Sequence, residues 1–366
     1  MSSSIANEKR IDIKSLDLEG LEEFMLSLGE SKERALRVYK QLWQKGAKTF
    51  DEMTTIAKST RRTLSEHADI HFLELAEHRV SEDGTTKFLW KIPQGGMIES
   101  VLIPDVNREE GLSDRMTLCV SSQWGCAMKC SFCLTGDLGL KGHLTPSQIT
   151  NQPLQVAPYL PPGKRITNIV MMGMGEPLHN YQNLIIALRN MLHYQALDFS
   201  HRKLTVSSVG LVPAIRKLAN ELPVNLAISL NASTEEQRRK VMPITNKYSL
   251  RELIECCKTI PLPPGKRIAF EYVMMAGFND TLEDAQRVLD LLKDVPAKVN
   301  LIPYNENPDR EIRRPSHATV KAFQNYMVTR GMHCTVRATR GKDISAACGQ
   351  LGKAAESIRP NQEIQP

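Results

Sequence analysis

The sequence predicts an α/β fold: a partial barrel of about six β/α repeats, preceded by an N-terminal helical domain and a short β extension. Three observations predict this fold. Apolar residues recur at helical spacing over about the first 75 residues, strand-like runs around a turn come next, and from Thr117 onward strand-like and helical runs alternate. We therefore expect domains at residues 1–75, 76–112 and 113–352, with a tail at 353–366.

The N-terminal segment contains three helical stretches. Leu21–Gly29 ends at a glycine, Lys32–Gly46 has its apolar residues at helical spacing, and a third stretch covers about Asp51–His67. The second stretch also carries a set of cations on its exposed side, namely Lys32, Arg34, Arg37, Lys40 and Lys45. A solvated helix face and a contact with RNA both explain such charges.

The β extension begins with a hairpin. Asp83-Gly84 is a strong turn signal between two strand-like runs that cover residues 78–92. A third strand is expected over Met97–Pro104, where Glu99 interrupts an otherwise apolar run. A lone carboxylate in a strand usually faces solvent, so the pattern alone assigns no role to Glu99.

The barrel is expected from the alternation that follows. Its predicted strands are Thr117–Ser121, Ile166–Met172, Lys203–Ser208, Asn225–Leu230, Arg267–Met274, Lys298–Pro303 and His333–Arg337. Helical patterns between them include Asn180–Leu192, Thr281–Leu292 and Ser316–Arg330. This order implies a parallel sheet with right-handed crossovers, and a functional site at the carboxyl ends of the strands.

The composition is that of a globular protein. Of 366 residues, 41% are hydrophobic and 24% are charged, and the net charge of +6 permits a nucleic-acid partner without requiring one. We expect no signal peptide and no membrane contact, because no apolar run approaches the ~20 residues of a membrane span. The eight irregularly spaced cysteines favour a reducing compartment, so we expect a cytoplasmic protein.

Three closely spaced cysteines are the most informative motif. Cys126, Cys130 and Cys133 have the spacing C-x3-C-x2-C, and the next cysteine is Cys256. Three thiolates on a short loop can hold three irons of a 4Fe–4S cluster and leave the fourth iron open. A zinc site requires four ligands in two pairs, and disulfides do not suit so short a loop. This spacing resembles that of the radical-SAM superfamily, which implies S-adenosylmethionine (SAM) as a second cofactor.

Glycines and small polar residues stand where several predicted strands end. They lie in Gly173–Pro177, Ser207-Ser208, Ser229–Asn231 and Tyr304-Asn305. Each segment alone reads as a turn or a helix cap, but together they favour a ligand site at one end of a barrel. A further candidate is Cys348, because its small neighbours and nearby cations favour a thiolate.

Four motifs carry a more specific resemblance. They are Thr117–Gln123, Met171–Leu178, Asn300–Pro303 and Ala346–Leu351. In this order and spacing they resemble the RlmN family of radical-SAM RNA methyltransferases, of which the Cfr enzymes are close relatives. The resemblance extends from about residue 10 to residue 352 and implies a radical-SAM barrel for the third domain.

The resemblance implies a role for each matching residue. Cys126, Cys130 and Cys133 match the cluster ligands, with SAM on the open iron. Cys348 matches the cysteine that carries the methyl group, Cys119 its partner in a transient disulfide, and Glu99 the proton acceptor. The positions that match SAM contacts are Gly175, Glu176, Ser207, Ser229, Leu230, Asn231 and Asn305.

The implied reaction methylates carbon 2 of an adenosine in the peptidyl-transferase centre of 23S rRNA, and of the adenosine 3′ of the anticodon in tRNAs. Cys348 is methylated first, and a radical then forms on its methyl group and adds to the adenine ring. Glu99 removes the ring proton, and Cys119 attacks the sulfur of Cys348 and releases the product. The resemblance also implies an electron donor such as flavodoxin or ferredoxin, an RNA-binding N-terminal domain and a monomer.

Two alternatives remain open from the sequence. One is a Cfr-like enzyme that methylates carbon 8 of an rRNA adenosine. The other is a non-catalytic RNA-binding iron–sulfur protein, which would need none of Glu99, Cys119 and Cys348. A basic run beside Asn305, formed by Arg310, Arg313 and Arg314, is equally compatible with phosphate contact and with ordinary surface charge.

Overall fold

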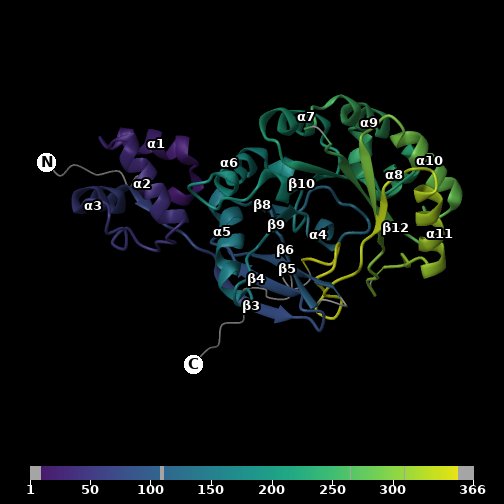
Figure 1. The fold of residues 1–366 in the computed structure, drawn as a ribbon, viewed down its shortest axis with the longest axis horizontal. Coiled ribbons are helices and arrows are strands. Elements are labelled where there is room, and N and C mark those ends of the chain that lie inside the picture. The colour runs from purple at the N-terminus through teal and green to yellow at the C-terminus, as the bar shows by residue number, and fades with distance from the viewer. Residues whose placement is uncertain (1–9, 108–110, 264, 309, 353–366) are drawn as a thin grey trace. The chain divides into compact units, whose positions relative to one another are not determined.

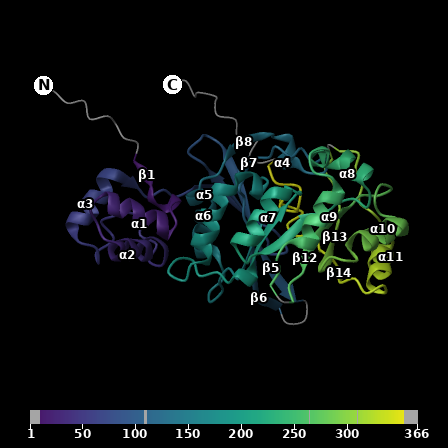
Figure 2. The ribbon, with the colours of Figure 1, turned by 90° about the horizontal axis from the view of Figure 1, so that it is seen from above.

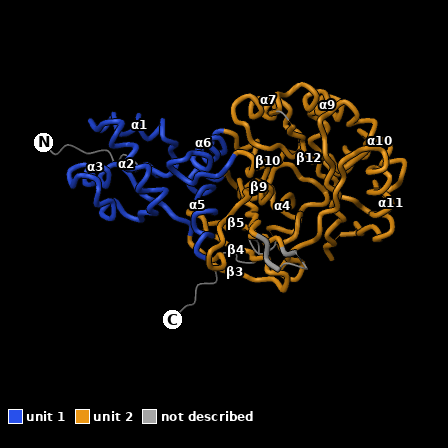
Figure 3. Tube along the Cα trace, in the orientation of Figure 1, with its two compact units in different colours: residues 1–73, 144–158, 182–200 blue, residues 74–143, 159–181, 201–366 orange. Residues whose placement is uncertain are grey.

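Residues 10–107, 111–263, 265–308 and 310–352 are described by a computed structural model, and the predicted tail at 353–366 lies outside them. The chain divides into two compact units (Figure 3). Unit 1 takes in the chain up to residue 73 together with residues 144–158 and 182–200, and unit 2 takes in the remainder. A search of the described residues finds no helix that is long and apolar enough to cross a membrane.

Unit 1 is mainly helical. Side-chain caps begin three of its α-helices. Asp17 accepts the backbone N–H of Gly20 at 3.0 Å, Ser31 accepts that of Arg34 at 3.4 Å, and Thr145 accepts that of Gln148 at 3.2 Å. The third helix begins at Lys58, later than the predicted Asp51, because turns occupy the intervening residues. The elements are β1 (Ile11–Asp12), α1 (Leu18–Ser27), α2 (Lys32–Trp43), α3 (Lys58–His67), β2 (Ala68–Asp69), α5 (Pro146–Val156) and most of α6 (Tyr181–Leu192).

Buried polar contacts join the three chain segments of unit 1. The hydroxyl of Tyr39, on the buried face of α2, donates to Asn190 of α6 at 2.7 Å. The ammonium of Lys14 is fully buried and donates to Asn151 of α5. Residues 144–158 and 182–200 therefore complete the hydrophobic core that the N-terminal helices begin.

Unit 2 is built on one large sheet (Figures 1 and 2). Among the described residues its strand order is β14-β13-β12-β11-β10-β9-β6-β5-β4-β3. Neighbours from β6 through β14 pair in parallel, whereas β3 to β6 pair in antiparallel order. The strands are β3 (Glu74–Val80), β4 (Thr86–Lys91), β5 (Met97–Asn107), β6 (Gly111–Cys119), β9 (Asn168–Met171), β10 (Leu204–Ser208), β11 (Asn225–Ser229), β12 (Ile268–Met274), β13 (Ala297–Pro303) and β14 (Cys334–Val336).

Helices cover the outer side of the parallel strands, as Figure 1 shows for α7, α9, α10 and α11. Because the strand order ends at β14 and β3, the barrel is open. The predicted α/β fold with a partial barrel is thus confirmed, and each predicted barrel strand has a counterpart. The helices of this layer are α7 (Val212–Glu221), α8 (Glu235–Val241), α9 (Leu250–Thr259), α10 (Leu282–Leu292) and α11 (His317–Val328).

Candidate active site

The cysteine motif lies on a loop that follows β6. The short strand β7 (Gln123–Gly125) leads into the loop and α4 (Leu134–Asp137) ends it. Gly125 has a φ of +76°, and a Cβ at this position would lie 1.8 Å from the carbonyl oxygen of Gly139. Only glycine can make this turn, which directs the loop into the barrel.

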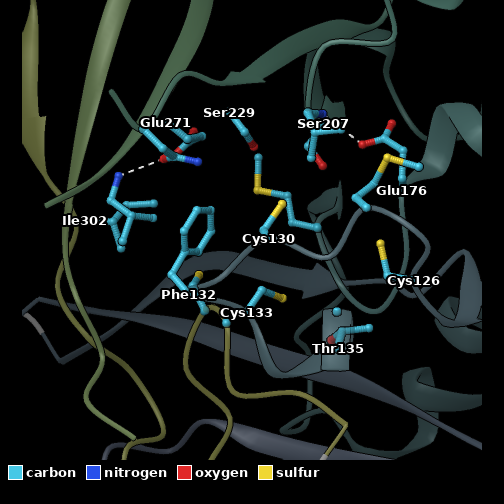
Figure 4. Close-up of a pocket in the computed structure, with 18 of the residues that line it drawn as sticks. Cys126, Cys130, Phe132, Cys133, Thr135, Glu176, Ser207, Ser229, Glu271 and Ile302 are labelled. Atoms are coloured by element: carbon cyan, nitrogen blue, oxygen red, sulfur yellow. Dashed lines mark hydrogen bonds between the residues drawn. The ribbon is translucent and has the colours of Figure 1, made fainter. Parts of the chain in front are cut away.

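A cavity of about 160 Å³ lies at the carboxyl ends of the parallel strands (Figure 4). Residues from eight separate segments of unit 2 meet there, because parallel strands end at the same edge of a sheet. Among the predicted site residues, the following line it: Cys126, Cys130, Cys133, Gly175, Glu176, Ser207, Ser229, Asn231, Asn305 and Cys348.

Three predicted residues do not line this cavity. The side chain of Leu230 is fully buried in the core, and its backbone N–H donates to the carbonyl of Glu271 at 2.9 Å. Glu99 and Cys119 are also buried, on β5 and β6 beside the cavity. Leu230 therefore belongs to the core next to the site, whereas Glu99 contacts the segment that carries Cys348.

The three clustered thiols fit a 4Fe–4S cluster. Burial raises the pKa of Cys126 to about 12 and raises that of Cys133 above its usual value. Burial and the neighbouring thiols raise the pKa of Cys130 well above its usual value. Bare thiols here would keep their protons, whereas iron would hold them as thiolates. Among the described residues no three ligands converge on a single metal ion. A cubane takes one cysteine at each iron, so thiols spread around one cavity suit it.

Glu176 places a buried carboxylate beside these thiols (Figure 4). It accepts the backbone N–H groups of Leu178 at 3.1 Å and of Val209 at 2.8 Å. Burial raises its pKa to about 7, and these hydrogen bonds oppose the rise. The preceding Gly175 has a φ of +99°, and a Cβ there would lie 2.5 Å from that of Gln123. The segment therefore presents bare backbone and one carboxylate, which suits a ligand with an ammonium group.

Cys348 lies on residues 339–352, which we name the C-terminal loop. Its side chain is exposed and lines the cavity. Asn305 donates to the carbonyl of Cys348 at 3.0 Å, the N–H of Leu134 donates to that of Gly349 at 2.9 Å, and Thr135 donates to that of Leu351 at 2.8 Å. The loop is thus held against the end of the cysteine motif, with its thiol toward the cavity.

The β3–β4 hairpin holds the other end of the C-terminal loop. Ser81 donates to the carboxylate of Asp343 at 2.5 Å, and the backbone N–H of Gly341 donates to Asp83 at 3.0 Å. Gly84 completes the turn with a φ of +79°. The predicted hairpin is therefore present, and it contacts the segment that carries Cys348.

Glu99 also contacts the C-terminal loop. Its side chain is fully buried, and Oε2 accepts the N–H of Gly352 at 3.0 Å. The ammonium of Lys87 lies 3.5 Å from Oε1, an ion pair longer than a good hydrogen bond, and donates to the carbonyl of Ser345 at 3.3 Å. Burial raises the pKa of Glu99, and Lys87 gives the strongest opposing effect. The strand pattern alone would suggest that Glu99 faces solvent, but its side chain is buried.

Cys119 lies within electrostatic reach of Cys348. Burial, with a smaller contribution from the charge of Cys348, raises the pKa of Cys119 to about 12, and the charge of Arg337 opposes the rise. A buried thiol next to an exposed one suits a pair in which the first attacks the sulfur of the second.

Two charged residues of the cavity were not predicted as site residues from the sequence. Glu271 is buried on β12, where Oε1 accepts from Asn300 at 2.8 Å and Oε2 has no partner among the described residues. Arg337 follows β14, and the charge of Cys348 is the main cause that raises its pKa. Among the described residues, Arg337 is the cation that lines this cavity. Glu271 interrupts an apolar strand just as Glu99 does, so the same signal could have found it.

Comparisons with known proteins agree with this geometry. Residues 11–70 match the family described as "Ribosomal RNA large subunit methyltransferase N-terminal domain", and residues 120–292 match the "Radical SAM superfamily". The chain is also similar to a crystal structure of a radical SAM methyltransferase from Sphaerobacter thermophilus. That match has a TM-score of 0.85 and 37% identity, over 93% of this chain and 99% of the other.

Curated relatives match over nearly the whole chain. A protein of Geobacter sulfurreducens named dual-specificity RNA methyltransferase RlmN is 46% identical, over 96% of this chain and 94% of its own length. A protein of the same name from Pelobacter propionicus is 47% identical, over 97% of this chain and 99% of its own length.

Proposed function

Because the chain belongs to the RlmN family of radical SAM RNA methyltransferases, we propose that it methylates carbon 2 of adenosine in 23S rRNA and in tRNA. The observation that carries the proposal is the position of Cys348. Its exposed thiol lines the same cavity as the three clustered thiols and Glu176, while Glu99 and Cys119 lie beside its loop. A protein that only binds RNA needs no such arrangement.

The cavity residues have two tasks in this proposal. Cys126, Cys130 and Cys133 hold the 4Fe–4S cluster, and the backbone at Gly175 with the carboxylate of Glu176 receives the amino group of SAM. When bound, the cluster and SAM together supply the radical chemistry that a carbon atom without an acidic proton requires. Ser207, Ser229, Asn231 and Asn305 present further polar groups to SAM, while Leu230 contributes backbone.

Cys348, Glu99 and Cys119 complete the reaction. Cys348 carries the methyl group on its sulfur, which brings the carbon to the adenine ring. Glu99 accepts the proton that leaves the ring carbon, so its carboxylate must be ionised. The sulfur of Cys119 then attacks that of Cys348 and a disulfide forms. The bond from the sulfur of Cys348 to the product carbon breaks with its electron pair on that carbon, which takes up a proton and becomes the methyl group. External thiols must reduce the disulfide, which agrees with a cytoplasmic location.

We assign RNA contact to the N-terminal helices, within the proposed domain 1–75. Arg37 and Lys45 of this segment are exposed, and neither forms an ion pair among the described residues. In unit 2, Arg310 pairs with Asp137 at 2.5 Å and Arg314 donates to Thr339 at 3.1 Å. The exposed Arg313 therefore remains the member of the arginine run most open to phosphate. The electron donor is expected to be of the flavodoxin or ferredoxin type, and the enzyme to act as a monomer.

Mass spectrometry of the modified nucleoside tests the proposal. Anaerobically reconstituted protein is incubated with SAM, a reductant and an rRNA fragment of the peptidyl-transferase centre, with Cys348→Ala alongside. We expect 2-methyladenosine from the wild type and none from the variant. 8-Methyladenosine would move the chemistry to the Cfr-like alternative. If deoxyadenosine forms without methylation, the RNA substrate is wrong, and if neither product forms, the radical assignment fails.

A further inference from the structure

A second cavity lies in unit 2, at the opposite end of the parallel strands from the candidate active site. Its volume is about 820 Å³. Arg202, Lys266 and His333 line it from the segments just before β10, β12 and β14, so it lies mainly at the amino ends of these strands, and it extends along β14 to Arg337 and Arg340. Met172, Glu271 and Arg337 line both cavities. The two cavities therefore adjoin each other at these three residues, and the rest of their linings differ.

Cations dominate the lining of this second cavity, which we name the basic cavity. Seven arginine or lysine side chains line it, namely Arg115, Arg202, Lys266, Arg267, Lys298, Arg337 and Arg340. The carboxylates of Asp105 and Glu271 are the acidic groups of the lining. Seven cations against two carboxylates make this lining strongly positive, although the whole chain has a net charge of only +6.

The cations of the basic cavity repel one another. Burial lowers the pKa of Lys266, and so do the charges of Arg202 and Lys298. Lys266 donates to the neutral side chain of Asn225, and neither Lys266 nor Lys298 forms an ion pair among the described residues. Like charges held together raise the free energy of the fold, and an anion bound between them would relieve this repulsion.

The lining also narrows the chemistry of such an anion. No Phe, Tyr or Trp side chain is among the described residues that line the basic cavity, so it has no aromatic platform on which a base could stack. Guanidinium and ammonium groups match phosphate oxygens well. A volume of about 820 Å³ leaves room for more than one phosphate group.

We propose that the basic cavity is a binding site for a ligand that carries two or more phosphate groups, recognised through its phosphates and not through a base. The phosphates can come from the backbone of an RNA strand or from a free oligophosphate. The site is distinct from the methyl-transfer cavity, and its occupancy does not depend on the proposed methylation.

Isothermal titration calorimetry of the full-length, cluster-reconstituted protein at low salt tests this proposal. The probes are inorganic pyrophosphate, inorganic triphosphate and a short uridine-only oligonucleotide, which contains no adenine target. The test variant is Lys266→Gln/Lys298→Gln. The matched control, Lys258→Gln/Lys321→Gln, removes the same charge from α9 and α11, whose lysines do not line the basic cavity.

We expect the wild type and the control to bind at least one class of probe, and the test variant to bind it about tenfold or more weakly. If pyrophosphate or triphosphate binds, and binds more weakly to the test variant, the site takes a free oligophosphate. If only the oligonucleotide binds, and binds more weakly to the test variant, the site takes an RNA backbone. The proposal is wrong if the wild type binds no probe, or if the test variant binds as well as the control. Arg267→Gln, at an exposed position, provides a second variant if far-ultraviolet circular dichroism shows that the double variant does not fold. Methylation is not the readout, so failure here leaves the proposed function intact.

Discussion

Glu99 shows how a single residue gains a role from its surroundings. Its carboxylate is fully buried, and burial raises its pKa while Lys87 opposes the rise. The folded protein thus holds the proton of Glu99 to a higher pH than the unfolded chain does. Between the pKa of Glu99 in the unfolded chain and its higher pKa in the folded protein, the free energy of unfolding falls as pH rises. Below the pKa in the unfolded chain Glu99 is protonated in both states, so its burial carries no such cost. A base must be ionised to act, so the acidic limb of the activity profile should lie above the ordinary glutamate range.

Replacing Lys87 should move this acidic limb. Lys87→Gln removes the cation that most strongly lowers the pKa of Glu99, so the limb should shift to higher pH and activity near pH 7 should fall about tenfold. The pH profile of adenosine methylation measures the shift. Lys91→Gln is a matched control, because Lys91 lies on the same strand and pairs with the exposed Glu74. A profile that does not move in Lys87→Gln would contradict the assignment of Glu99 as the base.

Arg337 should act on the thiol that releases the product. Its charge lowers the pKa of Cys119, so Arg337→Gln should raise that pKa further and slow the attack on Cys348. We expect RNA to remain covalently attached to the protein for longer, which a more slowly migrating band in denaturing gels would show. At higher pH the rate of RNA release should partly recover, because more of Cys119 is then thiolate. Arg337→Lys retains a cation and should accumulate less of this species. Equal accumulation in the two variants would show that charge is not the cause.

At the scale of elements, the connections between strands decide how the site is built. The hairpin of β3 and β4 and the start of β5 hold opposite ends of the C-terminal loop, through Asp83, Ser81 and Glu99. Turn chemistry and alternation predicted the hairpin itself. They could not predict its contact with residues about 260 positions later, because a long-range contact depends on sheet order and not on local spacing.

Loss of this contact should lower activity more than stability. Asp343→Ala removes two hydrogen bonds, from Ser81 at 2.5 Å and from the N–H of Glu82 at 3.3 Å. We expect a cost of about 1 kcal/mol in unfolding free energy, and faster hydrogen exchange confined to the C-terminal loop. Methylation should fall severalfold because Cys348 is held less firmly. The control Asp290→Ala removes an exposed carboxylate from α10 that, within the described part of the chain, accepts from Gln286 alone. Unchanged exchange in the loop would argue against this role.

At the scale of the whole molecule, the chain returns twice to its N-terminal unit. Lys14 illustrates how, since its fully buried ammonium donates to Asn151 and lies over the rings of Trp43 and Phe72, at 5.0 and 4.0 Å from their centroids. Hydrophobic periodicity identified the N-terminal helices. It could not show that α5 and α6, which the sequence places between barrel strands, are grouped with them.

The stability of unit 1 should depend on pH through Lys14. Burial lowers its pKa from 10.5 to about 7, so between these values the unfolded chain binds more protons than the folded one. Unit 1 should therefore gain stability as pH rises from about 7 toward 10.5. Chemical denaturation followed by the fluorescence of Trp43 measures the gain. Lys14→Met should flatten this dependence, whereas Lys48→Met, in an exposed position, should leave it unchanged.

The sequence by itself determined the order of strands and helices and the three-cysteine motif. It also indicated where polar residues would gather, because side-chain periodicity and motif spacing are local properties and parallel strands share one carboxyl edge. Only the tertiary structure decided that Glu271 and Arg337 lie beside Cys348, that Glu99 is buried against Gly352, and that cations meet at the other end of the barrel. These arrangements depend on which distant segments become neighbours, and sheet order and side-chain packing set that only when the whole chain folds.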